Sequence, residues 1–211
     1  RKKLYVSGFA LFTISSLLCA MSQNGAELLI FRMVQSVGAS FMIANSTAII
    51  TDAFPKNELG KALGINAMIV SVAAVIGPIL GGFLINFGWR TIFYINIPIG
   101  VFGTIWAGVS LVELHKAAKN ETFDFKGTFS FTIGMLALLV ALTIGGFTQW
   151  SSKPVVLLFI IAAFLLSIFV YIEVHARYPM LDMTLLKTRI LSFAYLSTLL
   201  NGIARGAVTF L

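Results

Sequence analysis

The 211-residue sequence is 58% hydrophobic and only 11% charged, with a mean hydropathy of +0.95. This composition excludes a soluble domain with one buried core and predicts an integral membrane protein. The formal net charge of +7 does not indicate nucleic-acid binding, because the basic residues lie at the ends of apolar stretches and form no basic face. The single cysteine, Cys19, lies within an apolar stretch, so neither a disulfide framework nor a cysteine metal site is expected.

Seven apolar stretches are each long enough to cross about 30 Å of hydrocarbon as a helix. The predicted fold is therefore an all-α polytopic membrane protein. Its spans cover about residues 4–22, 28–50, 62–86, 91–112, 127–148, 154–172 and 190–211. The fourth span is interrupted by Asn96, Pro98 and Gly100. Since the sequence has no initiator Met and is still apolar at Leu211, we expect it to begin and end within a longer protein.

Basic residues are distributed unequally over the segments that connect the predicted spans. Eleven of the fifteen Lys and Arg residues lie on one side, in residues 1–3, the loops at 52–61 and 113–126, and the connector at 174–189. The other side has two, Arg90 and Lys153. Because short loops rich in Lys and Arg stay in the cytoplasm, the richer side is predicted to be cytoplasmic in a multi-pass protein of a cell membrane.

The third predicted span contains an uncharged stretch, residues 64–82, whose small residues share one side of a helix. Ala73, Gly77 and Gly81 fall one turn apart along one ridge of that helix. In lipid, small residues allow helix backbones to approach closely. Pro78 also removes a hydrogen bond to the carbonyl of Ala74, which loosens the helix locally. The stretch therefore predicts a bendable helix with a face suited to close packing.

Two arginines lie inside predicted spans. Arg32 has two interpretations: either its side chain snorkels to the nearby outer interface, or it faces a central cavity. Gln35, one turn further on, shares its face and favours the cavity. Arg205, with Asn201 one turn before it, is either a second cavity residue or lies at the end of a shorter span. No carboxylate lies at mid-depth in a span, so a proton-binding acid, if the protein uses one, is expected outside this sequence.

Two runs of residues match known helix motifs: Leu28-x3-Arg32-x2-Gln35-Ser36-x-Gly38 and Gly64-x8-Ala73-x3-Gly77-Pro78-x2-Gly81-Gly82. They resemble the fourth-helix motif and the fifth-helix antiporter motif of the major facilitator superfamily. Gly88-Trp89-Arg90 and Phe93-Tyr94-x-Asn96-x-Pro98-x-Gly100 are similar to its drug:proton antiporters with fourteen spans. Ser36 and Ala73 stand where the family usually has Gly.

The resemblance implies a particular arrangement of the spans. Residues 1–112 would be helices three to six of an N-terminal bundle, 127–173 two inserted linker helices, and 190–211 the first helix of a C-terminal bundle. The rest of that C-terminal bundle would lie outside this sequence. The implied mechanism is alternating access, in which two bundles rock about a central site.

The resemblance also implies roles for three sets of residues. Arg32 would pair with, and tune, a protonatable acid on another helix, with Gln35 helping to hold it. Arg1, Lys2 and Lys3 would belong to a charge network at the cytoplasmic gate. The third predicted span would seal against the opposite bundle and limit proton leak through its motif residues Gly64, Ala73, Gly77, Pro78, Gly81 and Gly82.

The function implied is proton-coupled efflux of drug-like or other small organic molecules, with the proton gradient as energy source and no cofactor. The expected partners are the substrate, protons and the lipid bilayer, without nucleic acid. The alternatives are an importer or uniporter of the same fold, and a non-transporting membrane scaffold whose small-residue faces serve only to pack helices together. An enzyme is not expected, since the sequence has no His-Glu zinc pattern and no Ser, His and Asp set at membrane depth.

Overall fold

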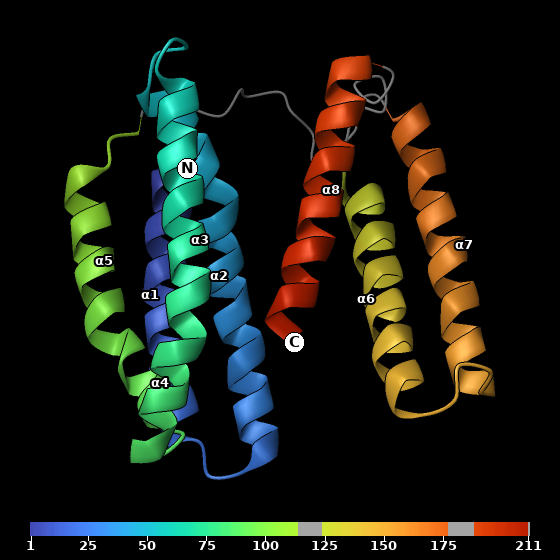
Figure 1. The fold of residues 1–211 in the computed structure, drawn as a ribbon, viewed down its shortest axis with the longest axis horizontal. Coiled ribbons are helices and arrows are strands. Elements are labelled where there is room, and N and C mark those ends of the chain that lie inside the picture. Colours follow the sequence, from blue (N-terminus) through green and yellow to red (C-terminus); the bar gives the residue numbers. More distant parts are fainter. Residues whose placement is uncertain (114–123, 177–187, 211) are drawn as a thin grey trace. The chain divides into compact units, whose positions relative to one another are not determined.

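The computed structural model describes residues 1–113, 124–176 and 188–210, and the side chains of residues 190, 205 and 207–210 lie outside that description. All regular secondary structure in these ranges is helical, which confirms the predicted all-α fold. The chain forms two compact units, Arg1–Ala117 and Ala118–Leu211 (Figure 1). Most residues of the two predicted cytoplasmic segments, 113–126 and 174–189, lie outside the described ranges.

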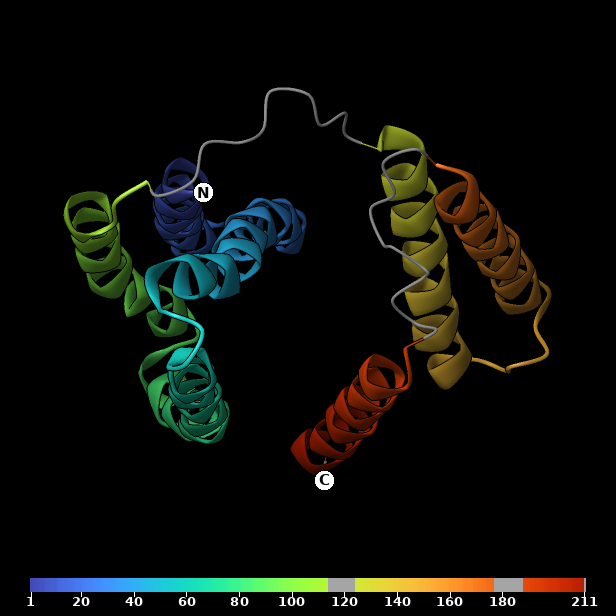
Figure 2. The same cartoon turned by 90° about the horizontal axis from the view of Figure 1, so that it is seen from above.

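The first unit is organised around its first helix. Its elements are α1 (Lys2–Met21), α2 (Gly25–Ala53), α3 (Leu59–Leu84), the short 3-10 helix η1 (Ile85–Phe87), α4 (Thr91–Tyr94) and α5 (Asn96–Ser110). α1 packs against both α2 and α5, which lie on different sides of it (Figure 2). The break between α4 and α5 follows from Pro98, because proline has no N–H to donate to the carbonyl of Tyr94.

Small residues allow α5 to approach α1 closely. A Cβ atom on Gly103 would lie 2.6 Å from the ring of Phe9, and one on Gly100 would overlap the side chain of Thr13. Ala107, one turn after Gly103, is also buried. Close backbone approach is the main source of helix association in lipid, where burial of apolar surface contributes little.

In the second unit, α6 (Phe125–Phe147) and α7 (Lys153–His175) pack together as an antiparallel hairpin (Figure 1). The buried face of α6 repeats every three or four residues and consists of small side chains: Gly127, Ser130, Gly134, Ala137, Ala141 and Gly145. A Cβ atom on Gly134 would lie 3.1 Å from Leu166 of α7, so the two helices are in close contact there. Among the described residues, α8 (Arg189–Phe210) packs against neither hairpin helix.

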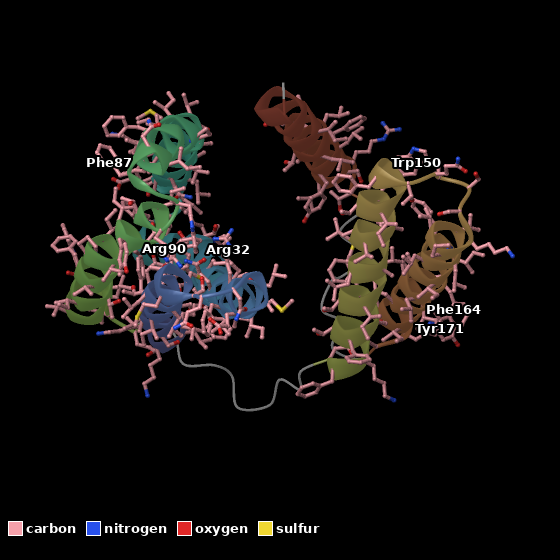
Figure 3. All side chains as sticks on the ribbon, turned by 90° about the horizontal axis from the view of Figure 1, so that it is seen from below. Arg32, Phe87, Arg90, Trp150, Phe164 and Tyr171 are labelled. Atoms are coloured by element: carbon pink, nitrogen blue, oxygen red, sulfur yellow. The ribbon has the colours of Figure 1, made fainter. Side chains whose placement is uncertain are left out.

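The described chain has six helical stretches long and apolar enough to cross a membrane. α8 runs from Arg189 to Phe210 and so covers the seventh predicted span, 190–211. Its described part includes the apolar stretch Leu191–Ala204, and a seventh membrane crossing stays a prediction. Large apolar side chains such as Phe87, Phe164 and Tyr171 are exposed and point away from the helices (Figure 3). A surface of this kind is suited to contact with lipid.

Candidate functional site

The start of α2 is fixed by a reciprocal cap. The side chain Oδ1 of Asn24 accepts a hydrogen bond from the backbone N–H of Glu27 at 2.8 Å, and Glu27 Oε2 accepts one from the N–H of Gln23 at 2.9 Å. The first bond satisfies an N–H group that the first helical turn leaves free, and the second ties Gln23, the residue before the cap, to the same turn. The carboxylate of Glu27 also lies where the helix dipole favours negative charge. This cap fixes the register of the turns that follow, which carry Arg32 and Gln35.

A chain of hydrogen bonds leads from Arg32 into the packing of α1 and α2. Arg32 Nη1 donates to Gln35 Oε1 at 2.9 Å, and Gln35 Nε2 donates to Ser16 Oγ of α1 at 2.5 Å. The hydroxyl of Ser16 in turn donates to the carbonyl of Phe12 at 2.8 Å. Gln35 is only 2% exposed and Ser16 is fully buried. The buried amide of Gln35 is therefore satisfied at both its oxygen and its nitrogen.

The guanidinium of Arg32 lies between Gln35 and an aromatic ring. Its central carbon is 5.8 Å from the ring centre of Phe93 in α4. Gln35 lies further from the α1–α2 loop than Arg32 does, so its bond to Arg32 directs the guanidinium toward the middle of α2. A snorkelling arginine would direct it toward the nearer helix end, at Gly25. In the described chain the arginine is nevertheless exposed, so its charge is available to a group beyond these residues.

A second arginine, Arg90, stabilises the same end of the first unit. Arg90 Nη2 donates to the backbone carbonyl of Ser22 at 2.8 Å, and its guanidinium stacks 4.3 Å from the ring centre of Trp89. The turn before Arg90 requires glycine, since Gly88 has a φ of 102°. Figure 3, which looks onto this end, labels Arg32 and Arg90 among the helices of the first unit. Arg90 therefore joins the loop after α1 to the start of α4.

The residues of the predicted antiporter motif all lie on α3, which remains one helix through Pro78. No residue of α3 is buried in the described chain. In that part of the chain, no atom outside the local backbone lies within 4 Å of a Cβ placed on Gly64, Gly77, Gly81 or Gly82. The described residues therefore leave the small face of α3 uncovered, and its sealing role stays a prediction.

The opposite end of the first unit carries the predicted gate residues. Arg1 Nη1 lies 2.5 Å from Asp52 Oδ2. Asp52 lies in the last turn of α2, where the helix dipole disfavours a negative charge, so the guanidinium offsets an unfavourable position. Arg1 and Lys2 line a cavity of about 290 Å³ together with Asp52 and Glu113. Lys3 is exposed. Of the three predicted gate residues, Arg1 and Lys2 line this cavity, and the gate role of all three stays a prediction.

The predicted cavity residues of the last helix belong to the second unit. Asn201 is exposed on α8, where it borders a shallow groove formed by residues of α8 itself. The side chain of Arg205 lies outside the described residues. Within the described ranges, no group of three or more His, Cys, Asp or Glu side chains is placed to hold a metal ion.

Ser16 and Phe93 belong to the polar site but were not among its predicted residues. Ser15 and Ser16 are adjacent hydroxyl residues within an uncharged span. The short loop between α1 and α2 makes these helices antiparallel neighbours. A hydroxyl in the half of α1 next to that loop could therefore have been matched with Gln35 in the corresponding half of α2. Phe93 belongs to the quoted run Phe93-Tyr94-x-Asn96-x-Pro98-x-Gly100, but nothing in that run pairs it with Arg32, because aromatic residues are common throughout this sequence.

The sequence profile of the Major Facilitator Superfamily matches residues 1–211. The chain belongs to this superfamily. It is 34% identical to the multidrug transporter protein MdtP of Bacillus subtilis, over 100% of the chain and 39% of that protein. It is 36% identical to the riboflavin transporter RibZ of Clostridioides difficile, over 89% of the chain and 40% of RibZ. It is 33% identical to the fatty acid resistance protein FarB of Neisseria gonorrhoeae, over 94% of the chain and 40% of FarB.

Membership confirms the family resemblance drawn from the motifs of α2 and α3. Members of the superfamily are transporters that move small substrates across membranes, and the apolar helices of this chain make it a multi-pass membrane protein. The chain spans about two fifths of the length of these relatives. Arg32 and Gln35 are the family-motif residues that the structure joins by a side-chain hydrogen bond.

Proposed function

We propose that this chain forms part of a secondary transporter that exports small organic molecules in exchange for protons. Arg32 carries the proposal. A cation within a span is costly unless it is paired or faces a polar region, and such residues usually mark a transport pathway. Its bond to Gln35 directs the charge toward the middle of the span, while the arginine stays exposed to whatever lies beyond the described helices.

The proposed partner of Arg32 is a carboxyl group on a helix outside this sequence. An opposite charge nearby favours the ionised form of an acid, so Arg32 would set the pH at which that acid takes up a proton. Protonation would remove the attraction between them. The bundles could then change their packing, which couples proton uptake from one side to substrate release on that side. The proton gradient is the proposed energy source, without a cofactor.

Two other regions have proposed roles in the same cycle. The small face of α3 would close against the remainder of the transporter and limit proton leak. The Arg1–Asp52 ion pair would help to hold the predicted cytoplasmic end shut in one of the two states. Both roles require surfaces that move apart and together, which fits the exposed positions of these residues in the described chain.

The test uses the full-length protein in liposomes with an imposed pH gradient and ethidium as the transported probe. We expect the wild type to move ethidium against its concentration gradient, and Arg32→Ala to abolish this movement. Melting temperature and elution volume should stay close to wild type, because Arg32 is exposed in the described chain, where it makes one side-chain hydrogen bond, to Gln35, and one contact with the ring of Phe93. Unchanged gradient-driven transport by a folded Arg32→Ala protein would refute the assignment.

A second candidate is uptake or facilitated diffusion by the same fold. The similarity to a relative named as a riboflavin transporter favours it. Riboflavin and ethidium are therefore compared as probes in the same liposomes, under gradients of both signs. Accumulation of riboflavin down its own gradient, independent of pH, would support the second candidate and contradict proton-coupled export. A protein that moves neither probe would contradict both candidates for these two compounds.

A further inference from the structure

We infer that Ser16 of α1 is a positioning residue for Arg32 and acts through Gln35. The inference rests on the proposed function, since it concerns how the transport arginine is oriented. Ser16 is fully buried at the contact of α1 with α2, and its hydroxyl is within hydrogen-bond distance of the amide nitrogen of Gln35. The oxygen of the same amide, Gln35 Oε1, accepts the hydrogen bond from Arg32.

The donors and acceptors fix which atom of Gln35 faces Arg32 and which faces Ser16 in this series of hydrogen bonds. Arg32 has only N–H donors, so the atom of Gln35 that faces it is the carbonyl oxygen. The amide nitrogen then faces α1 and requires an acceptor. Ser16 Oγ supplies it, because the hydroxyl proton is already donated to the carbonyl of Phe12, one turn earlier in α1. The helical backbone of α1 thus fixes the orientation of the Ser16 hydroxyl, and that hydroxyl fixes the orientation of the Gln35 amide.

The amide of glutamine needs such a fixed partner. Its terminal torsion has a broad minimum, so the orientation of the amide is decided by its hydrogen bonds. Without Ser16 Oγ the buried NH₂ of Gln35 would lack an acceptor in α1 and would turn toward another carbonyl. That rotation would move the Oε1 atom away from Arg32. The guanidinium would lose the bond that directs it toward the middle of the span.

Ser15 provides a matched comparison on the same helix. It is also fully buried, and its hydroxyl donates to the carbonyl of Leu11, one turn earlier. Within the described ranges it makes no side-chain hydrogen bond to α2. Ser15 therefore has the burial and the backbone bond of Ser16 but not the contact with Gln35. A change confined to Ser16 would separate positioning of Arg32 from general packing of a buried serine.

The experiment measures ethidium transport by the full-length protein in liposomes as a function of pH. The variants are Ser16→Ala, Gln35→Met, the double variant and Ser15→Ala. We expect Ser16→Ala to move the pH midpoint of transport upward by about one unit, because the acid loses part of the field of Arg32 and takes up its proton at higher pH. Gln35→Met should do the same, and the double variant should move it no further. Ser15→Ala should keep the wild-type midpoint.

Two results overturn the inference: a wild-type midpoint in Ser16→Ala, or shifts of Ser16→Ala and Gln35→Met that add in the double variant. Thermal unfolding of the same variants, together with the double variant of Ser15→Ala and Gln35→Met, gives a readout independent of transport. The losses in melting temperature should be less than additive for Ser16 with Gln35, and additive for Ser15 with Gln35. If the wild type shows no pH-dependent transport, the proposed function fails. The unfolding measurements still test whether Ser16 and Gln35 are in contact. Additivity between Ser16 and Gln35 then refutes the positioning contact.

Discussion

Gly8 of α1 and Gly38 of α2 lie against each other where the two helices cross. A Cβ atom on Gly38 would come within 2.7 Å of the backbone nitrogen of Phe12 and 2.9 Å of the carbonyl oxygen of Gly8. Both neighbours are backbone atoms, which cannot give way unless a whole helix moves. Gly38 lies one turn after Gln35, and Phe12, whose backbone it meets, lies one turn before Ser16. The crossing therefore sets the separation at which the hydrogen bond between Gln35 and Ser16 forms.

The first prediction concerns this crossing. Gly38→Ala should push α1 and α2 apart and lower the free energy of unfolding by about 1–3 kcal/mol, as overpacking commonly does. Thermal unfolding of the full-length protein in detergent measures the change. The control is Gly108→Ala on α5, where the described chain has no atom within 4 Å of the new methyl group. It should leave stability unchanged or raise it by up to about 1 kcal/mol. Equal effects of the two substitutions would rule out a tight crossing.

The sequence predicted the all-helical fold and the region of each span, because membrane helices need about twenty apolar residues and this chain supplies them repeatedly. Arg32 and Gln35 could be paired because they share a helix face. The link to Ser16 could not be predicted with the same certainty. It depends on the rotation of α1 about its own axis, and that rotation is fixed by the contact between Gly8 and Gly38.

Small residues illustrate the same limit of sequence reasoning. The glycine pattern of α3 predicts a close-packing face, but the described chain leaves that face uncovered. The small residues that do pack closely within the described chain include those of α6, together with Gly8, Gly38 and Gly103. A sequence shows that a helix face is free of bulk, whereas the partner that meets it is set by the arrangement of the other helices.

The second prediction distinguishes the face of α3 from these packed faces. Gly81→Leu should leave the melting temperature of the full-length protein unchanged or slightly raised, since leucine favours a helix by up to about 1 kcal/mol over glycine. It should nevertheless reduce ethidium transport and raise proton leak in liposomes, because the added bulk would keep the face from closing. Val72→Leu adds bulk on the opposite face of α3 and should have neither effect. Normal transport and leak in Gly81→Leu would contradict the sealing role.

The third prediction concerns the ion pair of Arg1 and Asp52. Both partners are partly exposed, with 44% and 15% of their side chains accessible, so Asp52→Asn should change the free energy of unfolding by less than about 1 kcal/mol. Transport should fall by about 5-fold or more if the pair biases one of the two states. Exchanging the charges, with Arg1→Asp and Asp52→Arg together, should restore most of the rate.

The control for this ion pair is Lys56→Gln, which removes an equal charge from an exposed side chain four residues after Asp52. It should leave the transport rate close to wild type, since the pairing and not the total charge is what the prediction requires. A rate in the exchanged double variant as low as in the single variants would argue against the pairing. So would an equal loss of transport in Lys56→Gln.

The fourth prediction tests the α6–α7 hairpin with two adjacent glycines. A Cβ atom on Gly145 would come within 2.7 Å of the indole ring of Trp150, whereas in the described chain nothing lies within 4 Å of one on Gly146. Gly145→Ala should therefore displace the indole and lower the free energy of unfolding by about 1 kcal/mol, the low end for overpacking, because Trp150 is largely exposed and can partly adjust. Gly146→Ala should be neutral or stabilising.

The indole is the proposed cause of that difference, so removing it should remove the effect. In a Trp150→Ala background, Gly145→Ala should lose its destabilising effect, and the non-additivity measures the contact directly. Thermal unfolding of the four proteins gives the comparison. If Gly145→Ala destabilises equally with and without Trp150, the strain lies elsewhere in the turn between α6 and α7. If Gly145→Ala and Gly146→Ala melt together, the end of α6 is not packed against the indole, and the close contact of the hairpin is limited to its middle, around Gly134 and Leu166.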